Sequence, residues 1–270
     1  MTRAMLFIVL VALPAAACSK SSTVGADGAV PLASASHVPA SSSSEPRGDT
    51  IATDTFQSSQ GPIAIHPINH ASFLIQFAGK AVYVDPTKNG SVAALPKATH
   101  ILLTHSHYDH FDQEGISRVR TSSTLLIGPP ILADKLPNLV VIRNGETKNI
   151  DGMQLDAVPM YNIQRGPSAG KLYHDKGQGN GYVIGLADKR IYVSGDTECI
   201  PEIRELKRVD IAFLCMNLPY TMPVEEAARC VTQFRPAVVF PYHSKGSDLG
   251  QFQKSLASEP GTEVRIRNWY

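Results

Sequence analysis

The chain has 270 residues, of which 43% are hydrophobic and 18% are charged. This composition excludes a fibrous, collagen-like or fully disordered protein. With 25 Lys and Arg against 24 Asp and Glu the net charge is +1, so charge gives no reason to expect nucleic acid or an anionic lipid surface as the main partner.

The first 18 residues have the form of a secretory signal. Arg3 precedes an apolar run over residues 5–13, which is too short for a membrane-spanning helix of about 20 residues. Small residues then lead to Cys18, as in a bacterial lipobox, with Ala15 in place of the usual leucine. We expect a lipoprotein-type signal peptide over residues 1–18, with simple cleavage and secretion, or a retained anchor, as the alternatives. The expected location is the bacterial cell envelope, with membrane contact only through an N-terminal lipid anchor.

Residues 19–58 are rich in Ser, Ala, Gly and Pro and contain few large apolar side chains. Such a segment cannot bury enough surface to offset the entropy lost on ordering. We therefore expect a flexible tether over residues 19–58 and one folded domain over residues 59–270.

Short β-branched or aromatic runs predict strands from residue 63 onward. Helical segments are fewer, and the clearest covers residues 223–234, where Pro223 suits the first turn and Glu225 and Glu226 complement the helix dipole. This order of strands and helices predicts mixed sheets with helices outside. The expected strands cover residues 63–65, 72–77, 81–84, 101–104, 125–127, 139–142, 182–186, 191–194, 211–214, 237–240 and 263–266, and the expected helices cover residues 113–120, 130–135, 201–206, 223–234 and 249–256.

Beyond Cys18 the chain has three cysteines, Cys199, Cys215 and Cys230, and none forms a CxxC motif. A zinc ribbon or thioredoxin-like motif is therefore excluded. We expect these three to act as small buried hydrophobes, with at least one thiol lacking an internal partner.

The segment most specific for function is residues 104–112, Thr-His-Ser-His-Tyr-Asp-His-Phe-Asp. It directly follows an apolar strand, and four potential ligands within six residues would be costly to bury without a purpose. His105 and His107 share one face of an extended chain, so they can bind one ion. After a turn, Asp109 and His110 can reach a second ion.

Further ligands follow later strands. Asp196 comes after the expected strand 191–194, where Gly195 allows a close backbone approach, and its two oxygens can bridge two cations. His243 follows the strand 237–240 in the same way. Imidazole and carboxylate ligands suit zinc, with manganese and iron as alternatives.

The HxHxDH motif, the later Gly-Asp-Thr and the Pro-Tyr-His near the end resemble the metallo-β-lactamase-fold hydrolase superfamily. Residues 69–73 (Asn-His-Ala-Ser-Phe), 84–86 (Val-Asp-Pro) and 220–223 (Tyr-Thr-Met-Pro) are similar to the branch of ascorbate-6-phosphate lactonase-like proteins and N-acyl-phosphatidylethanolamine phospholipase D. The resemblance spans about residues 63–269. It implies an αββα sandwich, in which two packed mixed β-sheets carry outer helices and the metals bind at one edge.

The resemblance also implies a ligand set. The first metal would be bound by His105 and His107, the second by Asp109, His110 and His243, and Asp196 would bridge the two. One ligand is absent, because the family usually has a histidine after the strand that ends here at residues 158–161, where this chain has Asn162. Three readings stay open: His174 enters from the following loop, Asn162 or water completes the first site, or only one metal binds tightly.

Other residues are candidates for the surroundings of the metals. The carboxylate of Asp85 would orient a metal-binding histidine or cap a strand end. In the related branch a histidine lies near the pocket rim at the position of His70. Tyr220 would line the pocket or pack at a strand end.

These residues predict a hydrolase with two zinc ions that lower the pKa of a bridging water and so supply hydroxide, whose proton Asp109 would hold. The expected substrate is a small-molecule or lipid-like ester, lactone or phosphodiester. The alternative is a cell-envelope binding protein that retains the metals with little turnover. A di-iron redox protein is disfavoured, because that relative usually carries Glu where this chain has His107.

Overall fold

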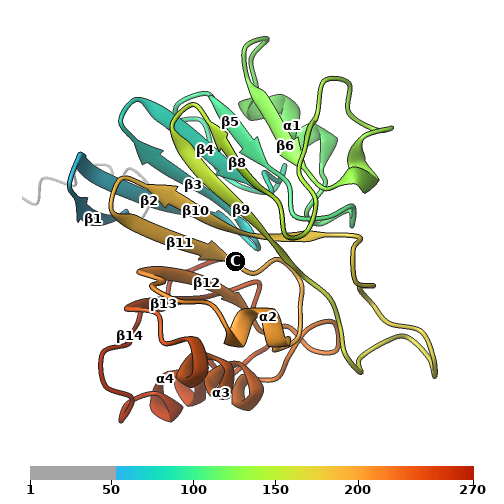
Figure 1. Ribbon diagram of the computed structural model, residues 1–270, viewed down its shortest axis with the longest axis vertical. Coiled ribbons are helices and arrows are strands. Elements are labelled where there is room, and N and C mark those ends of the chain that lie inside the picture. The colour runs from blue at the N-terminus through green and yellow to red at the C-terminus, as the bar shows by residue number, and fades with distance from the viewer. Residues whose placement is uncertain (1–52) are drawn as a thin grey trace, which may run out of the picture. The chain divides into compact units, whose positions relative to one another are not determined.

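The computed structural model describes residues 53–270. The expected signal peptide (1–18) and residues 19–52 of the expected tether lie outside the described residues. The described chain forms two sheets of seven strands each (Figure 1). The first sheet contains, in spatial order, β1 (Asp54–Ser58), β2 (Gly61–Asn69), β3 (Ser72–Phe77), β4 (Lys80–Val84), β5 (His100–Leu102), β6 (Leu125–Gly128) and β7 (Val140–Val141).

The second sheet repeats the pattern of the first. Its strands lie in the order β14 to β8, and they are β8 (Thr147–Ile150), β9 (Met153–Pro159), β10 (Asn180–Leu186), β11 (Lys189–Val193), β12 (Ile211–Cys215), β13 (Val238–Tyr242) and β14 (Glu263–Val264). In each sheet the first four strands pair antiparallel and the later ones pair parallel.

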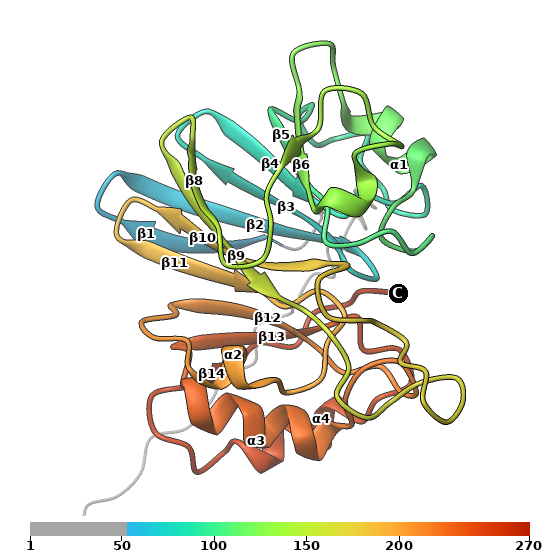
Figure 2. The same cartoon turned by 45° about the vertical axis from the view of Figure 1, so that its right-hand side comes forward.

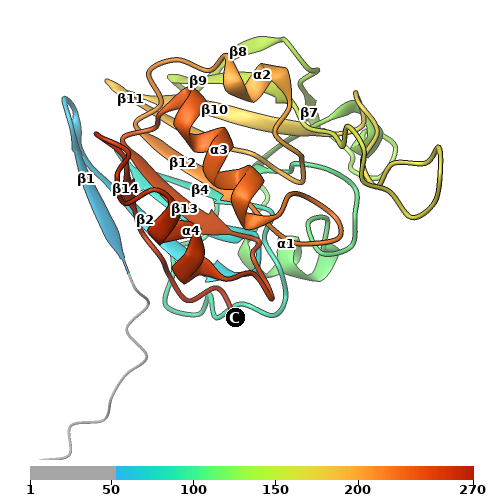
Figure 3. The ribbon, with the colours of Figure 1, turned by 90° about the horizontal axis from the view of Figure 1, so that it is seen from below.

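Helices cover the outer faces of both sheets (Figure 2). The helix α1 (Gln113–Val119) lies on the first sheet. The longer α3 (Val224–Phe234) and α4 (Leu249–Ser255) lie over the second sheet (Figure 3), and the short α2 (Pro201–Arg204) lies beside α3. The expected αββα sandwich is confirmed. No helix within residues 53–270 is long and apolar enough to cross a bilayer.

Strand alternation explains the layers. In β4, Val82 and Val84 point into the core between the sheets, whereas Ala81 and Tyr83 join the cluster beneath α1. Because both faces of this strand are buried, its sequence is apolar at almost every position rather than alternating with polar residues.

The boundary expected between tether and domain is wrong. Residues 54–58 form β1, which pairs with β2. Asp54 is 5% exposed and accepts hydrogen bonds from Arg265 (3.1 Å) and from Nε of Arg267 (2.7 Å), which follow β14. Phe56 is the only large apolar residue of β1, so the hydrophobic pattern was too weak to reveal the strand.

Other elements differ in detail from the expectation. The segment expected as a helix at 130–135 is a short 3₁₀ turn, η1 (Pro130–Leu132). Strand β8 was not expected, since Ile150 is its only apolar residue. Pro223 caps α3 instead of lying inside its first turn.

The expectation for the cysteines is partly wrong. Cys199 and Cys230 form a disulfide that joins the segment before α2 to α3. Cys215 is free and buried, as expected of a small apolar side chain.

Candidate metal centre

The predicted ligands gather at one edge of the sandwich because each follows the carboxyl end of a strand. His105 comes after β5, Asp196 after β11 and His243 after β13. β5 runs parallel to β4 in one sheet, and β11, β12 and β13 run parallel in the other. The carboxyl ends of these parallel strands therefore place their loops side by side.

The structure brings all seven predicted metal ligands together. Three groups of candidate ligand atoms have all members within 4.8 Å of one another. They are His105, His107 and His174; His105, His110 and Asp196; and His70, Asp109, His110 and His243. Asp196 lies between these groups of ligands. Its oxygens are 3.3 Å from Nε2 of His110 and 3.5 Å from Nε2 of both His174 and His243.

Several atoms facing this centre are buried without a hydrogen-bond partner. They are Nε2 of His105, Nε2 of His110, Nε2 of His243 and Oδ1 of Asp196. A buried polar atom left unpaired costs about 1–3 kcal/mol, and ten such side-chain atoms occur within residues 53–270. Because four of the ten converge here, the donor set fits one or more cations.

The orientation of the imidazoles also indicates a cation site. Nδ1 of His110 donates to Asp85 at 2.8 Å. The hydroxyl of Thr104 donates to the same carboxylate, so it can accept from Nδ1 of His105 at 2.9 Å. In both rings Nδ1 is held by a hydrogen bond and Nε2 points into the centre, as in a metal-ligating histidine.

His174, the loop histidine expected to complete the first metal site, lies beside His107 and His105. Its Nε2 lies 3.2 Å from Nδ1 of His107, and its Nδ1 donates to Oδ1 of Asn162 at 2.7 Å. The backbone N–H of His174 donates to the same oxygen at 2.9 Å, and Nδ2 of Asn162 donates to Glu198 and to the carbonyl of Tyr220. Asn162 therefore has no free oxygen for a metal and instead orients His174.

The electrostatics of the centre favour added positive charge. Burial on its own lowers the pKa of His110, but the carboxylates of Asp196 and Asp85 outweigh it and raise that pKa well above 6.5. Burial lowers the pKa of His105 well below 6.5 and the pKa of His174 to about 4, so both rings are neutral and can act as ligands.

Asp109 lies at the entrance of the centre. Its side chain is 30% exposed, and its Oδ2 is 3.1 Å from Nε2 of His70 and 3.5 Å from Nε2 of His243. Burial raises the pKa of Asp109, but the adjacent rings of His243, His70 and His110 outweigh it and hold the pKa far below its usual range. The carboxylate is therefore ionised and available at the surface of the centre.

Three residues of the centre have a strained backbone conformation. His70, Asp85 and His243 adopt left-handed conformations with φ of 58°, 40° and 44°. Non-glycine residues rarely adopt this region, and it costs energy that the surrounding structure must offset. Gly195, beside Asp196, has φ +59°, and a Cβ there would come within 2.7 Å of the sulfur of Met160.

The last two residues brace two of these loops. The carbonyl of Trp269 accepts from the backbone N–H of His70 at 2.7 Å, and its indole donates to the carbonyl of Pro241 at 2.7 Å. The hydroxyl of Tyr270 accepts from the N–H groups of Ser244 and Lys245, both at 2.9 Å. The resemblance to the metallo-β-lactamase superfamily extended to Trp269 but assigned this residue no role.

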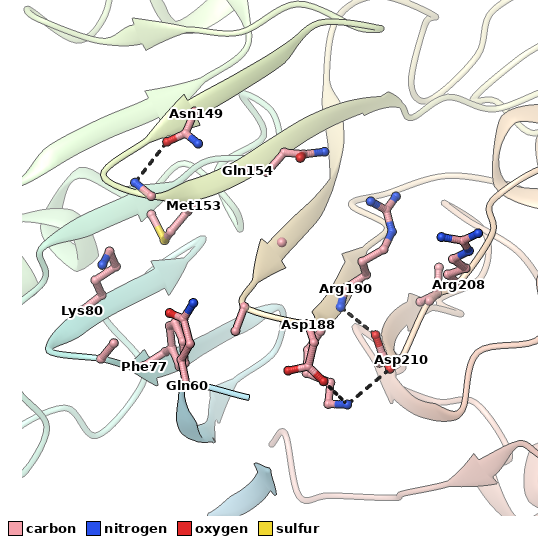
Figure 4. Close-up of a pocket in the computed structure, with 16 residues that line it drawn as sticks. Gln60, Phe77, Lys80, Asn149, Met153, Gln154, Asp188, Arg190, Arg208 and Asp210 are labelled. Atoms are coloured by element: carbon pink, nitrogen blue, oxygen red, sulfur yellow. Dashed lines mark hydrogen bonds and ion pairs between the residues drawn. The ribbon is translucent and has the colours of Figure 1, made fainter. Parts of the chain in front are cut away.

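A separate cavity of about 700 Å³ lies at the other edge of the sandwich, where hairpin turns meet (Figure 4). Lys80 at the start of β4 and Lys189 at the start of β11 line it, whereas the metal centre lies beyond the ends of these strands. Many of its charges pair among themselves: Lys189 contacts Asp188 and Asp210, and the backbone N–H of Arg190 donates to Asp210. This cavity shares no residue with the metal centre.

The sequence of this chain is similar to those of known proteins. A family model described as "Beta-lactamase superfamily domain" matches residues 64–243. A metal-dependent hydrolase of Pyrococcus horikoshii is 30% identical over 225 residues, covering 74% of this chain and 97% of the relative. One from Thermococcus onnurineus is 30% identical over 194 residues, covering 67% of this chain and 84% of the relative.

This chain is also similar to solved structures. A Parabacteroides distasonis protein described as a metal-dependent hydrolase has a TM-score of 0.76 at 37% identity, covering 81% of this chain and 99% of that one. The Ignicoccus hospitalis metallo hydrolase Igni18 has a TM-score of 0.64 at 21% identity, covering 76% of this chain and 95% of that one. The second similarity concerns the fold alone.

Proposed function

The chain belongs to the beta-lactamase superfamily domain family and is a metal-dependent hydrolase, and from this premise we propose that it binds two zinc ions and cleaves an ester, lactone or phosphodiester. The observation that carries the proposal is the convergence of unpaired, buried Nε2 atoms and Asp196 Oδ1 on one centre. Imidazole and carboxylate donors in this number suit zinc. Membership of the lactonase-like and phospholipase D-like branch stays a prediction.

The ligands divide between two ions. His105, His107 and His174 would bind the first, and Asp109, His110 and His243 would bind the second, with Asp196 shared by both. Zinc bound there would lower the pKa of a coordinated water toward neutrality and polarise the substrate's carbonyl or phosphoryl oxygen.

The chain's own residues supply orientation and a proton acceptor. Asp85 and Asn162 fix the rings of His110 and His174. The ionised, partly exposed carboxylate of Asp109 would accept the proton that the attacking water loses. His70, 3.1 Å from Asp109, would hold that carboxylate in place.

Exposed apolar side chains favour a substrate with an apolar part. Within residues 53–270 six large hydrophobic residues are exposed, and five of them belong to segments that contain the candidate ligands or contact His70 or Asn162. Tyr108 lies between His107 and Asp109, and the ring of Tyr270 lies 5.7 Å from that of His70. The other three are Ile163, Leu218 and Tyr220, in the segments that Asn162 joins. Apolar groups around a polar centre are typical of ligand sites.

The test combines metal analysis with a substrate screen. Purified protein loaded with zinc should retain two ions per chain and hydrolyse at least one of a panel of nitrophenyl esters, lactones and bis(nitrophenyl) phosphate. Asp109→Asn should abolish this hydrolysis. Zinc retained without turnover on a broad panel would favour the alternative, a metal-containing binding protein. Protein that retains no zinc at residues 105–110 would refute both.

We also propose that the protein is exported and anchored by lipid at Cys18. The Cys199–Cys230 disulfide supports export, because such bonds persist in oxidising compartments. Cell fractionation with and without Cys18→Ala tests the anchor. The variant should move from the membrane to the soluble envelope fraction, and an unchanged distribution would contradict it.

A further inference from the structure

Glu198 is a buried carboxylate two residues after Asp196. It is 1% exposed and accepts hydrogen bonds from the backbone N–H groups of residues 163–165, at 3.2, 3.3 and 2.7 Å. It also accepts from Nδ2 of Asn162 at 3.2 Å. Four donors on one buried carboxylate fix the start of the loop that carries His174.

The loop needs such an anchor. His174 lies 12 residues beyond Asn162, and ordering a loop of this length costs conformational entropy. The contact between Glu198 and Asn162 continues directly to the imidazole, because Oδ1 of Asn162 accepts from Nδ1 of His174 at 2.7 Å. The chain from carboxylate to ring therefore contains only two hydrogen bonds.

On its other side Glu198 is connected to α3. Nη1 of Arg165 lies 3.3 Å from Glu198, an ion-pair distance without hydrogen-bond geometry, and Nη2 of Arg165 lies 2.9 Å from Glu226 of α3. Glu226 accepts from the backbone N–H of Cys199 at 3.2 Å, and Cys199 is disulfide-bonded to Cys230, also on α3. Ionic, hydrogen-bonded and covalent links thus converge on residues 198–199.

We propose that Glu198 is a positioning residue, which fixes His174 at the metal centre through Asn162 and is itself anchored to α3 by Arg165 and the Cys199–Cys230 disulfide. The inference rests on the proposed function, because it assumes that His174 binds zinc. It explains how a loop histidine can replace a ligand that would otherwise follow a strand directly. The carboxylate of Glu198 accepts its hydrogen bonds from residues 162–165 rather than from the candidate ligands.

The test measures zinc binding in Glu198→Gln. The amide loses one acceptor oxygen, so the hydrogen bonds to the loop cannot all form. By analogy with other residues that orient ligands, zinc at one of the two sites should bind about 10–100-fold more weakly, with the other site unchanged. Glu225→Gln is the matched control, since Glu225 is exposed on α3. Competition with a chelating dye gives both affinities, and circular dichroism of the zinc-free proteins checks the fold.

A double-mutant cycle separates positioning from general stability. If Glu198 acts through His174, then Glu198→Gln should cause no further loss of zinc affinity in a His174→Ala background. Additive losses, or unchanged affinity in Glu198→Gln alone, would overturn the inference. Wild-type protein that binds no zinc would instead refute the proposed function.

Arg165→Met provides a second perturbation should Glu198→Gln fail to fold. It removes the link to Glu226 but leaves the backbone donors to Glu198 intact. Zinc affinity at the same site should fall by at least about threefold, a smaller effect than the 10–100-fold expected for direct partners of a ligand. An affinity equal to that of the wild type would overturn the inference.

Discussion

Asp85 and His110 are joined by a 2.8 Å hydrogen bond between two side chains that are fully shielded from solvent. The same carboxylate accepts from the backbone N–H of Thr104 at 2.8 Å and from its hydroxyl at 2.6 Å. Asp85 thus connects the end of β4 to the loop after β5 and keeps the proton of His110 on Nδ1. The consequence is a histidine whose Nε2 is committed to the centre.

Replacing Asp85 by Asn should weaken zinc binding. The amide can still accept a hydrogen bond, but it loses the charge that strengthens His110 as a ligand, and such changes typically cost about 10–100-fold in affinity. Isothermal titration of zinc-free protein measures the change. Asp134→Asn, at an exposed position, should leave the affinity unaltered, and equal affinities for the two variants would contradict this role of Asp85.

Replacing His174 by Ala should remove one zinc ion before the other. The first site then retains only His105 and His107 besides the shared Asp196, while the second keeps Asp109, His110 and His243. Elemental analysis during stepwise dialysis against a chelator should give one ion per chain over a range where the wild type holds two. His66→Ala, outside these groups, is the control. Simultaneous loss of both ions would argue against separate sites.

The metal-free protein should lose stability as pH falls from about 6.5 to 4. Burial lowers the pKa of His174 to about 4 in the folded state, against 6.5 in an unfolded chain. Within this window the unfolded state binds the proton and the folded state does not, so acid favours unfolding. His174→Ala should reduce the pH slope of the unfolding free energy by up to about 1.4 kcal/mol per pH unit. Urea unfolding with chelator present measures it, and identical slopes would refute the prediction.

Reducing the disulfide should destabilise the protein. Cys199 and Cys230 are 31 positions apart, and closing a loop of this length contributes about 3–4 kcal/mol by the chain-entropy estimate. Thermal unfolding with and without dithiothreitol checks this. The double variant Cys199→Ala, Cys230→Ala should not respond to reductant. A response in the variant would assign the effect to something other than this bond.

Much of the fold and the predicted ligand set was readable from the sequence for physical reasons. The HxHxDH segment places four ligands within six residues, and an apolar strand precedes it, so neither its position nor its chemistry depended on distant contacts. Asp196 and His243 were readable because each follows a buried strand. The structure brings these residues together, and the αββα sandwich is confirmed.

What the sequence left out depends on long-range contacts. Glu198 lies in a loop, where a carboxylate is usually solvated, and only the fold places the backbone N–H groups of residues 163–165 around it. The pairing of Cys199 with Cys230 likewise requires α3 to pack beside the segment before α2. β1 was missed because one aromatic residue gives no periodicity.

The clamp between Asp54 and the two arginines at positions 265 and 267 has a mechanical consequence. It ties the first strand of one sheet to the segment that follows the last strand of the other. If the protein is tethered by its leading end, any tension from that side enters at β1. The load would then be shared by both sheets through this clamp, rather than peeling a lone edge strand away.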